Sequence, residues 1–455
     1  MPVEENVNSD TYMKYNTLGY TPKCRIYDSL QQLLSPSSVD DLAPPPHAAA
    51  LKETPISLSL PDFSIAVFRN AENLPAEWDS LLPKGQLVLS RAYLNVFAQN
   101  PPEGMGFAYL LFYKGQHPVG LASCQLMEFR ALRQIQSLRQ PVNGKASERV
   151  LHWLKRSIAR RINTRIIICG AAQFSGEYAF LFDDRRVPPA EQAGLLEQAL
   201  GELARQLEAD GWKPNGIVVK DFYSETRPHL KPLSDKGYTA CAFQPNMVLT
   251  LRPEWQSFED YLNAMSSKYR VRARRAIKKR KQARLEELDM DGVRRYSKQL
   301  HELYIGVAAQ ADFNLLQLPA EYFLSLKEAF PQKFRVLAYF QQDQLIGFCT
   351  TLRNGQELEA HFIGFRQEEN REFQLYLNML YDMVRLAIEE EKVEQLIFSR
   401  TAMEIKSSVG AEPRDMYCYL RYLNGPVNRL APAIVRQLEP QTEWRQRHPF
   451  SQQED

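Results

Sequence analysis

The chain has 455 residues, about three times the length of a common domain, which favours two folded domains over one. Hydrophobic residues make up 44% of it and charged residues 24%, so a soluble protein with sizeable cores is expected. Its 56 Lys and Arg nearly balance 54 Asp and Glu, and the formal charge of +2 argues against a nucleic-acid binder that is basic all over. A local basic patch is still compatible with that balance.

The six cysteines stand alone, without a Cys-x-x-Cys pair or a Cys/His cluster. Their spacing argues against a zinc site or a disulfide framework and favours a reducing compartment. The opening MPVEENVNSD has neither the basic nor the apolar region of a signal peptide, and no apolar stretch is long enough to span a bilayer. We therefore expect a cytoplasmic protein without a bound metal.

Residues 1–60 are expected to form a poorly ordered arm. Polar and small residues dominate there, and Ser35–Pro46 has the Pro/Ser-rich composition of a linker. Folded sequence begins near Phe63, where FSIAVF alternates as a strand does. Short helices and strands are then expected over Glu77–Leu82, Arg91–Phe97, Ala108–Tyr113, Val119–Met127, Ile166–Cys169 and Glu177–Phe182. The basic stretch Leu132–Arg165 favours neither type of element.

The clearest pattern is a repeated order of elements. Apolar residues at helical spacing run from Leu195 to Leu207. A strand over Ile217–Lys220, a helix that ends near Gly237 and a long strand over Cys241–Leu251 follow them. About 180 residues later the order recurs: a helix over Tyr376–Ile388, a strand over Gln395–Phe398, a helix that ends near Gly410 and a strand over Met416–Leu423. A duplicated unit explains this order, although many single α/β domains contain a similar run.

Antiparallel-looking strands precede the helix of the second copy, over Phe334–Phe340, Leu345–Leu352 and Leu358–Phe365, and Asn354-Gly355 between two of them is a hairpin signal. Strands that lead into a helix and return as strands describe a mixed sheet covered by helices. The expected fold class is α/β, with two similar mixed sheets flanked by helices. The expected boundaries are an arm over 1–60, domains over 61–248 and 249–425, and a helix and tail over 426–455.

The most unusual segment is Lys268–Arg284, KYRVRARRAIKKRKQAR, which holds ten Lys or Arg in seventeen residues and no acid. We expect Lys268, Arg270 and Arg274 to face a cleft between the domains and to bind an anion. That anion could be a nucleotide-linked precursor, an RNA end or a lipid head group at a membrane surface. A solvated helix, balanced by the acidic residues on either side, would explain the same composition.

Two stretches of the second half resemble a known family. Met265–Leu288 resembles the helix that opens the second domain of Fem-type aminoacyltransferases, and Phe398–Pro413 resembles the closing signature of that group. Gly170–Phe180, Val218–Asp221 and Leu233–Tyr238 fall where the group places similar stretches, so the resemblance covers roughly 63–425. It implies two tandem GNAT-like domains that transfer an acyl or aminoacyl group to an amine, such as a cell-wall precursor in peptidoglycan synthesis. The donor that it implies is an acyl-CoA or an aminoacyl-tRNA.

The chain departs from this group where the acetyl-CoA loop of GNAT enzymes would follow the strand ending near Phe365. Arg366–Arg371 (RQEENR) has no glycine and carries two Glu, which oppose the approach of a pyrophosphate. This departure keeps a second interpretation open, in which the protein is a non-catalytic, degenerate GNAT pair that binds an anionic ligand.

Amine acylation needs a group that takes a proton from the amine and donors that hold the developing oxyanion. Glu359 and His361 lie two residues apart on an expected strand, so both point to one face. Ser399 and Arg400 follow the strand Gln395–Phe398, and Lys406 can reach the same space from the next helix. We expect Glu359, His361 and Lys406 to be catalytic. Substrate binding is expected from Ser399, Arg400, Lys268, Arg270 and Arg274. Ordinary surface polarity would also place such residues on strands and helices.

Overall fold

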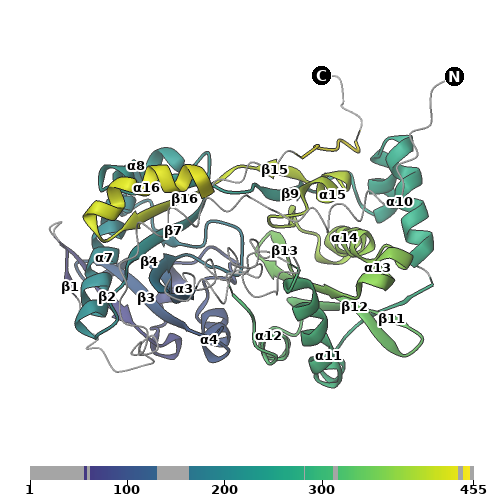
Figure 1. Cartoon of the computed structure of the whole chain (residues 1–455), viewed down its shortest axis with the longest axis horizontal. Coiled ribbons are helices and arrows are strands. Elements are labelled where there is room, and N and C mark those ends of the chain that lie inside the picture. The colour runs from purple at the N-terminus through teal and green to yellow at the C-terminus, as the bar shows by residue number, and fades with distance from the viewer. Residues whose placement is uncertain are drawn as a thin grey trace, which may run out of the picture.

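The computed structural model describes residues 56–58, 62–130, 163–280, 282–310, 316–438 and 444–450. Most of the expected arm (1–60), the basic stretch 132–162 and the end of the tail lie outside these residues. In the described part, two sheets stand side by side with helices around them (Figure 1). The predicted α/β class, with two mixed sheets flanked by helices, is confirmed.

The first unit is built from the first half of the chain. After the short strand β1 (Ile56–Ser57), its elements are β2 (Phe63–Phe68), α3 (Glu77–Ser80), α4 (Arg91–Gln99), β3 (Met105–Lys114), β4 (His117–Arg130), β5 (Asn163–Cys169), β6 (Phe180–Phe182), α7 (Pro189–Ala209), β7 (Gly216–Tyr223), α8 (Lys231–Asp235) and β8 (Thr239–Ala242).

The second unit repeats this order after two extra helices. After β8 the chain forms β9 (Asn246–Thr250), α9 (Phe258–Ala264), α10 (Ser267–Arg280), β10 (Arg284–Glu287), α11 (Met290–Ala308), α12 (Tyr322–Ala329), β11 (Phe334–Gln341), β12 (Gln344–Asn354), β13 (Glu357–Phe365), α13 (Gln367–Phe373), α14 (Leu375–Leu386), β14 (Gln395–Ile397), α15 (Met403–Ser408), β15 (Glu412–Arg414), β16 (Met416–Tyr422) and α16 (Gly425–Leu438). The basic helix therefore ends at Arg280, and Arg284 already belongs to a strand.

The strand orders of the two sheets correspond, apart from β1 and β6, which have no counterpart in the second sheet. The first sheet runs β1-β2-β3-β4-β5-β7-β16-β8, with β6 beside β4, and the second runs β10-β11-β12-β13-β14-β9-β15. Each contains one parallel pair at the same place, β5 with β7 and β13 with β14, between antiparallel neighbours. This agreement is what a duplicated unit requires.

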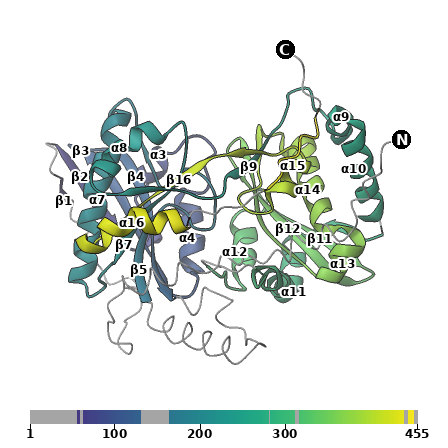
Figure 2. The ribbon, with the colours of Figure 1, turned by 45° about the horizontal axis from the view of Figure 1, so that its top comes forward.

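The two units exchange their last strands. β16 follows β15 along the chain but lies between β7 and β8, and β9 follows β8 along the chain but lies between β14 and β15. Figure 2 shows the yellow strand β16 beside β7 of the first sheet, and β9 on the side of the second sheet. Division of the chain at residue 248 therefore does not separate the sheets. The long strand expected over Cys241–Leu251 is in fact β8 in one sheet and β9 in the other.

Three large apolar cores in the described part of the chain follow from the alternation of side chains along the strands. One face of the first sheet packs on α7, and one face of the second packs on α14. The opposite faces of both sheets contribute to a single shared core, together with α4, α11 and α12. Because that core is continuous, it fixes the two sheets relative to each other. Within the described ranges, no helix has the length and apolarity needed to cross a bilayer.

Candidate functional site

Side chains of β13 face the shared core where the first unit meets the second. A β-bulge between β12 and β13 lets both His361 and Phe362 turn toward this side. The Thr350 hydroxyl stabilises the bulge, because it accepts from the Phe362 N–H (3.0 Å) and donates to the Phe362 carbonyl (3.1 Å). We call the region between β13 and the loop Gly170–Tyr178 the junction.

Glu359 is buried in the junction, with 1% of its surface exposed. The Tyr178 hydroxyl of the first unit donates to its Oε1 atom at 2.6 Å, and the Asn354 side-chain amide donates to that hydroxyl at 3.1 Å. Its other oxygen, Oε2, has no hydrogen-bond partner in the described part of the chain. Burial raises the pKa of Glu359 to about 8, so the carboxyl group is mostly protonated at neutral pH and ionises just above it.

A chain of hydrogen bonds connects His361 to the first unit. His361 Nε2 lies 2.8 Å from the Tyr322 hydroxyl, which lies 2.9 Å from the Tyr93 hydroxyl. Gln173 Nε2 donates to Tyr93 (3.2 Å), and Gln125 Nε2 donates to Gln173 Oε1 (2.8 Å). The imidazole also stacks on Phe174, with ring centroids 4.8 Å apart.

The direction of this chain can be worked out from one backbone group. The N–H of Ala172 can only donate, and it donates to Gln125 Oε1 at 3.0 Å, which makes the Gln125 amide nitrogen the donor to Gln173. Each later group then accepts on one side and donates on the other, so Tyr322 donates to His361 Nε2. Burial lowers the pKa of His361 and keeps the ring neutral, and its proton therefore resides on Nδ1. That atom is buried and has no partner in the described part of the chain.

A second polar cluster joins the units where β7 and β14 end. The Asp221 carboxylate is fully buried and accepts from the Arg400 guanidinium and the Lys220 amine. Asp221 has φ +63° at a bulge opposite Cys418 and accepts from the Cys418 thiol at 3.3 Å. Arg400 therefore ties the second unit to the first.

Lys406 is buried, with 5% of its surface exposed, and it supports the loop after β14. Its amine donates to the carbonyls of Ser399 (3.2 Å) and Arg400 (2.6 Å). Ser399, Thr401 and Ala402 have φ values of +60°, +68° and +45°, a region that side chains rarely adopt. Burial lowers the pKa of Lys406 to about 7. The lysine thus holds a strained loop in place.

The structure brings some of the predicted residues together and separates others. Glu359 pairs with Ile397 across the parallel strands, two residues before Ser399, so Glu359 and His361 on β13 lie beside the loop that contains Ser399 and Arg400. Lys406 contacts that loop from α15. Lys268, Arg270 and Arg274 lie on α10, at the end of the molecule away from the first sheet (Figure 1). The expectation that these three cations face a cleft between the domains is wrong. Arg270 instead caps the carbonyls of Asn263 and Met265, and Arg274 pairs with Glu259.

Sequence reasoning missed Tyr178, Tyr93, Lys220 and Asp221 as members of the site, and it explained Tyr322 by core packing. Alignment of the two halves could have found two of them, because Leu89 and Tyr93 in the first unit correspond to Leu318 and Tyr322 in the second, at the same spacing. The hydroxyls of these two tyrosines meet between α4 and α12.

The segment after β13 is helical and encloses the start of α14. Asn370 accepts from the Tyr376 N–H at 2.9 Å, and the Asn378 amide donates to the carbonyls of Phe373 (3.0 Å) and Gln374 (3.1 Å). With Glu368 and Glu369 in its first turn, α13 does not fit a pyrophosphate.

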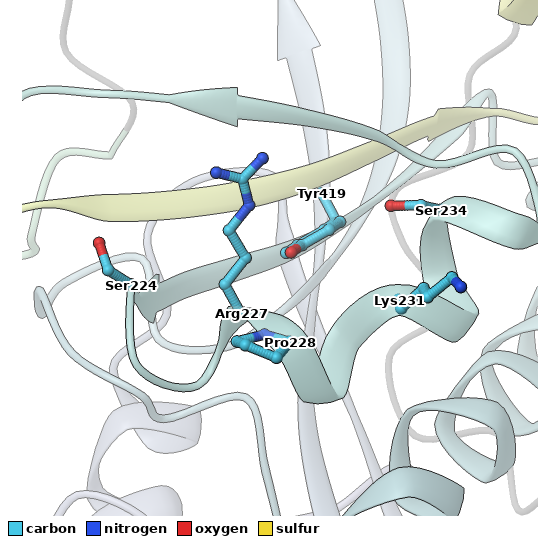
Figure 3. A pocket seen from close by; sticks show the side chains of 6 residues that line it. All are labelled: Ser224, Arg227, Pro228, Lys231, Ser234 and Tyr419. Atoms are coloured by element: carbon cyan, nitrogen blue, oxygen red, sulfur yellow. The ribbon is translucent and has the colours of Figure 1, made fainter.

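A hollow of about 350 Å³ lies elsewhere on the first unit, between α8 and β16 (Figure 3). Arg227 extends toward the strand that carries Tyr419, and the Ser234 hydroxyl points into the same space (Figure 3). Ser224 and Lys231 complete its polar lining, and Pro228 is an apolar member of the lining. The lining contains no carboxylate, and neither cation has an ion-pair partner among the described residues, so the hollow suits an anion.

Comparisons with known proteins give structural similarity only. No family model matches the chain, and no curated protein matches it. Among solved structures, FemX has 12% identity and a TM-score of 0.48, over 80% of this chain and 99% of that one. A tandem GNAT protein from the clavulanic acid biosynthesis pathway has 10% identity and a TM-score of 0.44, over 79% and 98%. A GCN5-related N-acetyltransferase from Sphaerobacter thermophilus has 9% identity and a TM-score of 0.38, over 79% and 95%. Identities this low carry no information about the reaction.

Proposed function

We propose that this protein is an N-acyltransferase with two GNAT-like units, in which Glu359 takes a proton from the amine that is acylated. The observation that carries the proposal is the free Oε2 atom of Glu359, on a buried carboxyl group with a pKa of about 8. A base for amine chemistry should titrate near the working pH, because it must be ionised often enough to accept a proton and basic enough to hold it.

In the proposed step, the amine nitrogen attacks the acyl carbon and a C–N bond forms. Glu359 Oε2 accepts the proton that the nitrogen loses, while Tyr178 holds Oε1 in place. The bond from the acyl carbon to the leaving group then breaks, and the leaving group departs with the electron pair of that bond. Protonated Glu359 can return the proton to it, which balances the reaction.

We assign His361 the second role, as donor to the carbonyl oxygen that becomes negative in the transition state. Its Nδ1–H is buried and unpaired, and the hydrogen-bond chain from Ala172 fixes the tautomer that carries this proton. His361 lies two residues beyond Glu359, about 6.6 Å along the strand, and both side chains contact tyrosine hydroxyls at the junction. A donor placed in advance in a dry site stabilises such charge strongly.

Lys406 and Arg400 have a positioning role in this proposal. Lys406 donates to the backbone of the loop that contains Ser399 and Arg400, and Arg400 pairs with Asp221 of the first unit. Both contacts hold β14 and its loop beside β13. Ser399 stays a proposed substrate contact, because it lies at the same end of the sheet.

The proposed donor is an acyl-CoA and the proposed acceptor is the amine of an anionic metabolite, such as a Fem-type cell-wall precursor. Arg227 and Lys231 line the hollow with two cations that can bind phosphate. We therefore propose that the phosphate groups of the donor bind there. The alternative donor is an aminoacyl-tRNA, and the experiment described below compares it with acyl-CoA.

A second candidate is the non-catalytic, degenerate pair that binds an anion. The observation that favours it is α13, which closes the position where a GNAT donor loop would lie. The two candidates differ in whether a covalent product forms.

The experiment is an incubation of the purified protein with a panel of acyl-CoAs, aminoacyl-tRNAs and amines, with product detection by mass spectrometry. Wild-type protein should form an acylated amine, and Glu359→Gln should not. A rise in melting temperature on addition of a ligand, without product, would support the binding protein instead.

A further inference from the structure

The inner side of α10 is fixed to the second unit. Ala273 and Ala276 are completely buried, and the Asn378 amide donates to the Ala276 carbonyl at 3.0 Å. Arg280 pairs with the buried Asp382 at 3.2 Å. The helix is therefore held in one orientation, and its other side always faces outward.

The outward side is a continuous cationic surface. The exposed residues of α10 after Ser267 are Lys268, Val271, Arg274, Arg275, Lys278 and Lys279. At about 100° per residue, they occupy one arc of roughly 140°, which we call the outer face of α10. Glu259 pairs with Arg274, whereas the other four cations have no carboxylate partner in the described part of the chain.

Val271 is the one apolar residue among the exposed residues of this face, and it lies almost opposite the buried alanines. It is 53% exposed, more than Leu430 (49%) or Phe243 (38%), the other exposed large hydrophobic residues of the described chain. An apolar side chain at the most outward point gains nothing in water. It gains free energy only if another apolar phase covers it.

We propose that the outer face of α10 docks the protein on an anionic lipid bilayer. Its four free cations would lie among the phosphate groups of the lipid heads, and Val271 would enter the boundary between head groups and acyl chains. A nucleic acid would use the cations but would leave the valine without a partner, so Val271 favours the bilayer. This proposal does not depend on the acyl transfer, because no residue of the junction takes part in it.

The test measures co-sedimentation of the full chain with vesicles. Vesicles of equal parts phosphatidylglycerol and phosphatidylcholine should bind the protein at low salt and release it as salt rises, whereas pure phosphatidylcholine should not bind it. The triple variant Lys268→Glu/Arg275→Glu/Lys279→Glu should bind about 100-fold or more weakly. Val271→Ser should bind several-fold more weakly, with an unchanged dependence on salt.

The matched control is Lys236→Glu/Arg295→Glu/Lys333→Glu, which changes the net charge equally at exposed positions elsewhere. It should keep wild-type binding, and the melting temperature of each variant confirms that it is folded. Equal losses in both triple variants would overturn the proposal in favour of diffuse attraction. Absence of binding to anionic vesicles would overturn it outright. Binding to a structured RNA that the α10 triple abolishes and Val271→Ser leaves intact, without vesicle binding, would assign the surface to nucleic acid.

Discussion

The ionisation of Glu359 should set the pH dependence of the proposed reaction. With a pKa of about 8, the carboxylate that accepts the proton becomes more abundant as pH rises, so the rate should increase through about pH 8 and then level off. Glu359→Gln should lower kcat by roughly 10²-fold or more and remove this rise. Steady-state rates between pH 6 and 9.5 measure both effects.

The control for that variant is Glu357→Gln, since Glu357 is the neighbouring carboxylate and lies 3.5 Å from the same Tyr178 hydroxyl. It should retain most of the activity and the same pH profile. Equal losses of activity in the two variants would show that the reaction depends on the negative charge of the junction as a whole and that Glu359 has no special role.

The same group makes a prediction about stability. The pKa of Glu359 is higher in the folded protein than the usual 4.5, so the folded state holds this proton more tightly than the unfolded state. The contribution of Glu359 to the stability of the wild-type protein should therefore fall as pH rises from about 4.5 to above 8, by up to a few kcal/mol, on the order of the shift in pKa. Glu359→Gln has no such loss, and its melting temperature should exceed the wild-type value increasingly from pH 5 to pH 9. A constant difference across that range would mean that the carboxyl group ionises normally.

The tautomer of His361 depends on a residue that touches it from α12. Tyr322→Phe removes the hydroxyl that donates to Nε2, so the ring proton is no longer fixed on Nδ1. We expect kcat to fall about tenfold or more with little change in KM, because the oxyanion donor is used only in the transition state. Tyr339→Phe is the matched control, since it also removes a buried hydroxyl (2.9 Å from Asp382) but lies on the other face of the sheet. A similar loss of kcat in both variants would reduce the role of Tyr322 to stability.

At the scale of elements, the bulge in β13 decides which side chains reach the junction. Thr350→Val should leave the Phe362 N–H and carbonyl without partners and cost about 1–3 kcal/mol of stability. Thr351→Val, at the next position, should be neutral or stabilising, because the buried Thr351 hydroxyl has no hydrogen-bond partner in the described residues. Chemical denaturation of the two variants makes the comparison. Equal effects would contradict the role of the bulge.

Most elements could be predicted from the sequence, because alternation and helical spacing record which face is buried. The hairpin at Asn354-Gly355 and the helix from Tyr376 are examples, and period-2 spacing placed Glu359 and His361 on one side of a strand. The partners of these residues could not be predicted in this way. Tyr178 is 181 residues from Glu359 and Tyr93 is 229 residues from Tyr322, and local patterns contain nothing about such distances. The prediction for the basic helix was wrong for a related reason. Its many charges indicate that one side of the helix is exposed to solvent, but they do not indicate whether that side faces the other domain.

At the scale of the whole molecule, the exchange of β9 and β16 makes the two units one folding unit. A fragment that ends after β9 lacks β16 and would expose the edge of β7 where β16 lies, and such open edges favour aggregation. We expect residues 62–252 expressed alone to be insoluble or unfolded. The full chain should unfold in a single calorimetric transition. Two separate transitions, or a stable fragment, would contradict this view of the molecule.

The place of β16 also has a consequence for synthesis on the ribosome. The first sheet needs Met416–Tyr422, which are made after almost the entire chain, so it cannot be completed while the later residues are still being translated. Domains of most proteins close as soon as they emerge, at about 5–20 residues per second. Here the first half must wait for roughly 170 further residues with two strand edges open. Its need for chaperones should therefore be greatest during translation, and silent codon changes that slow elongation between the two halves should lower the yield of folded protein.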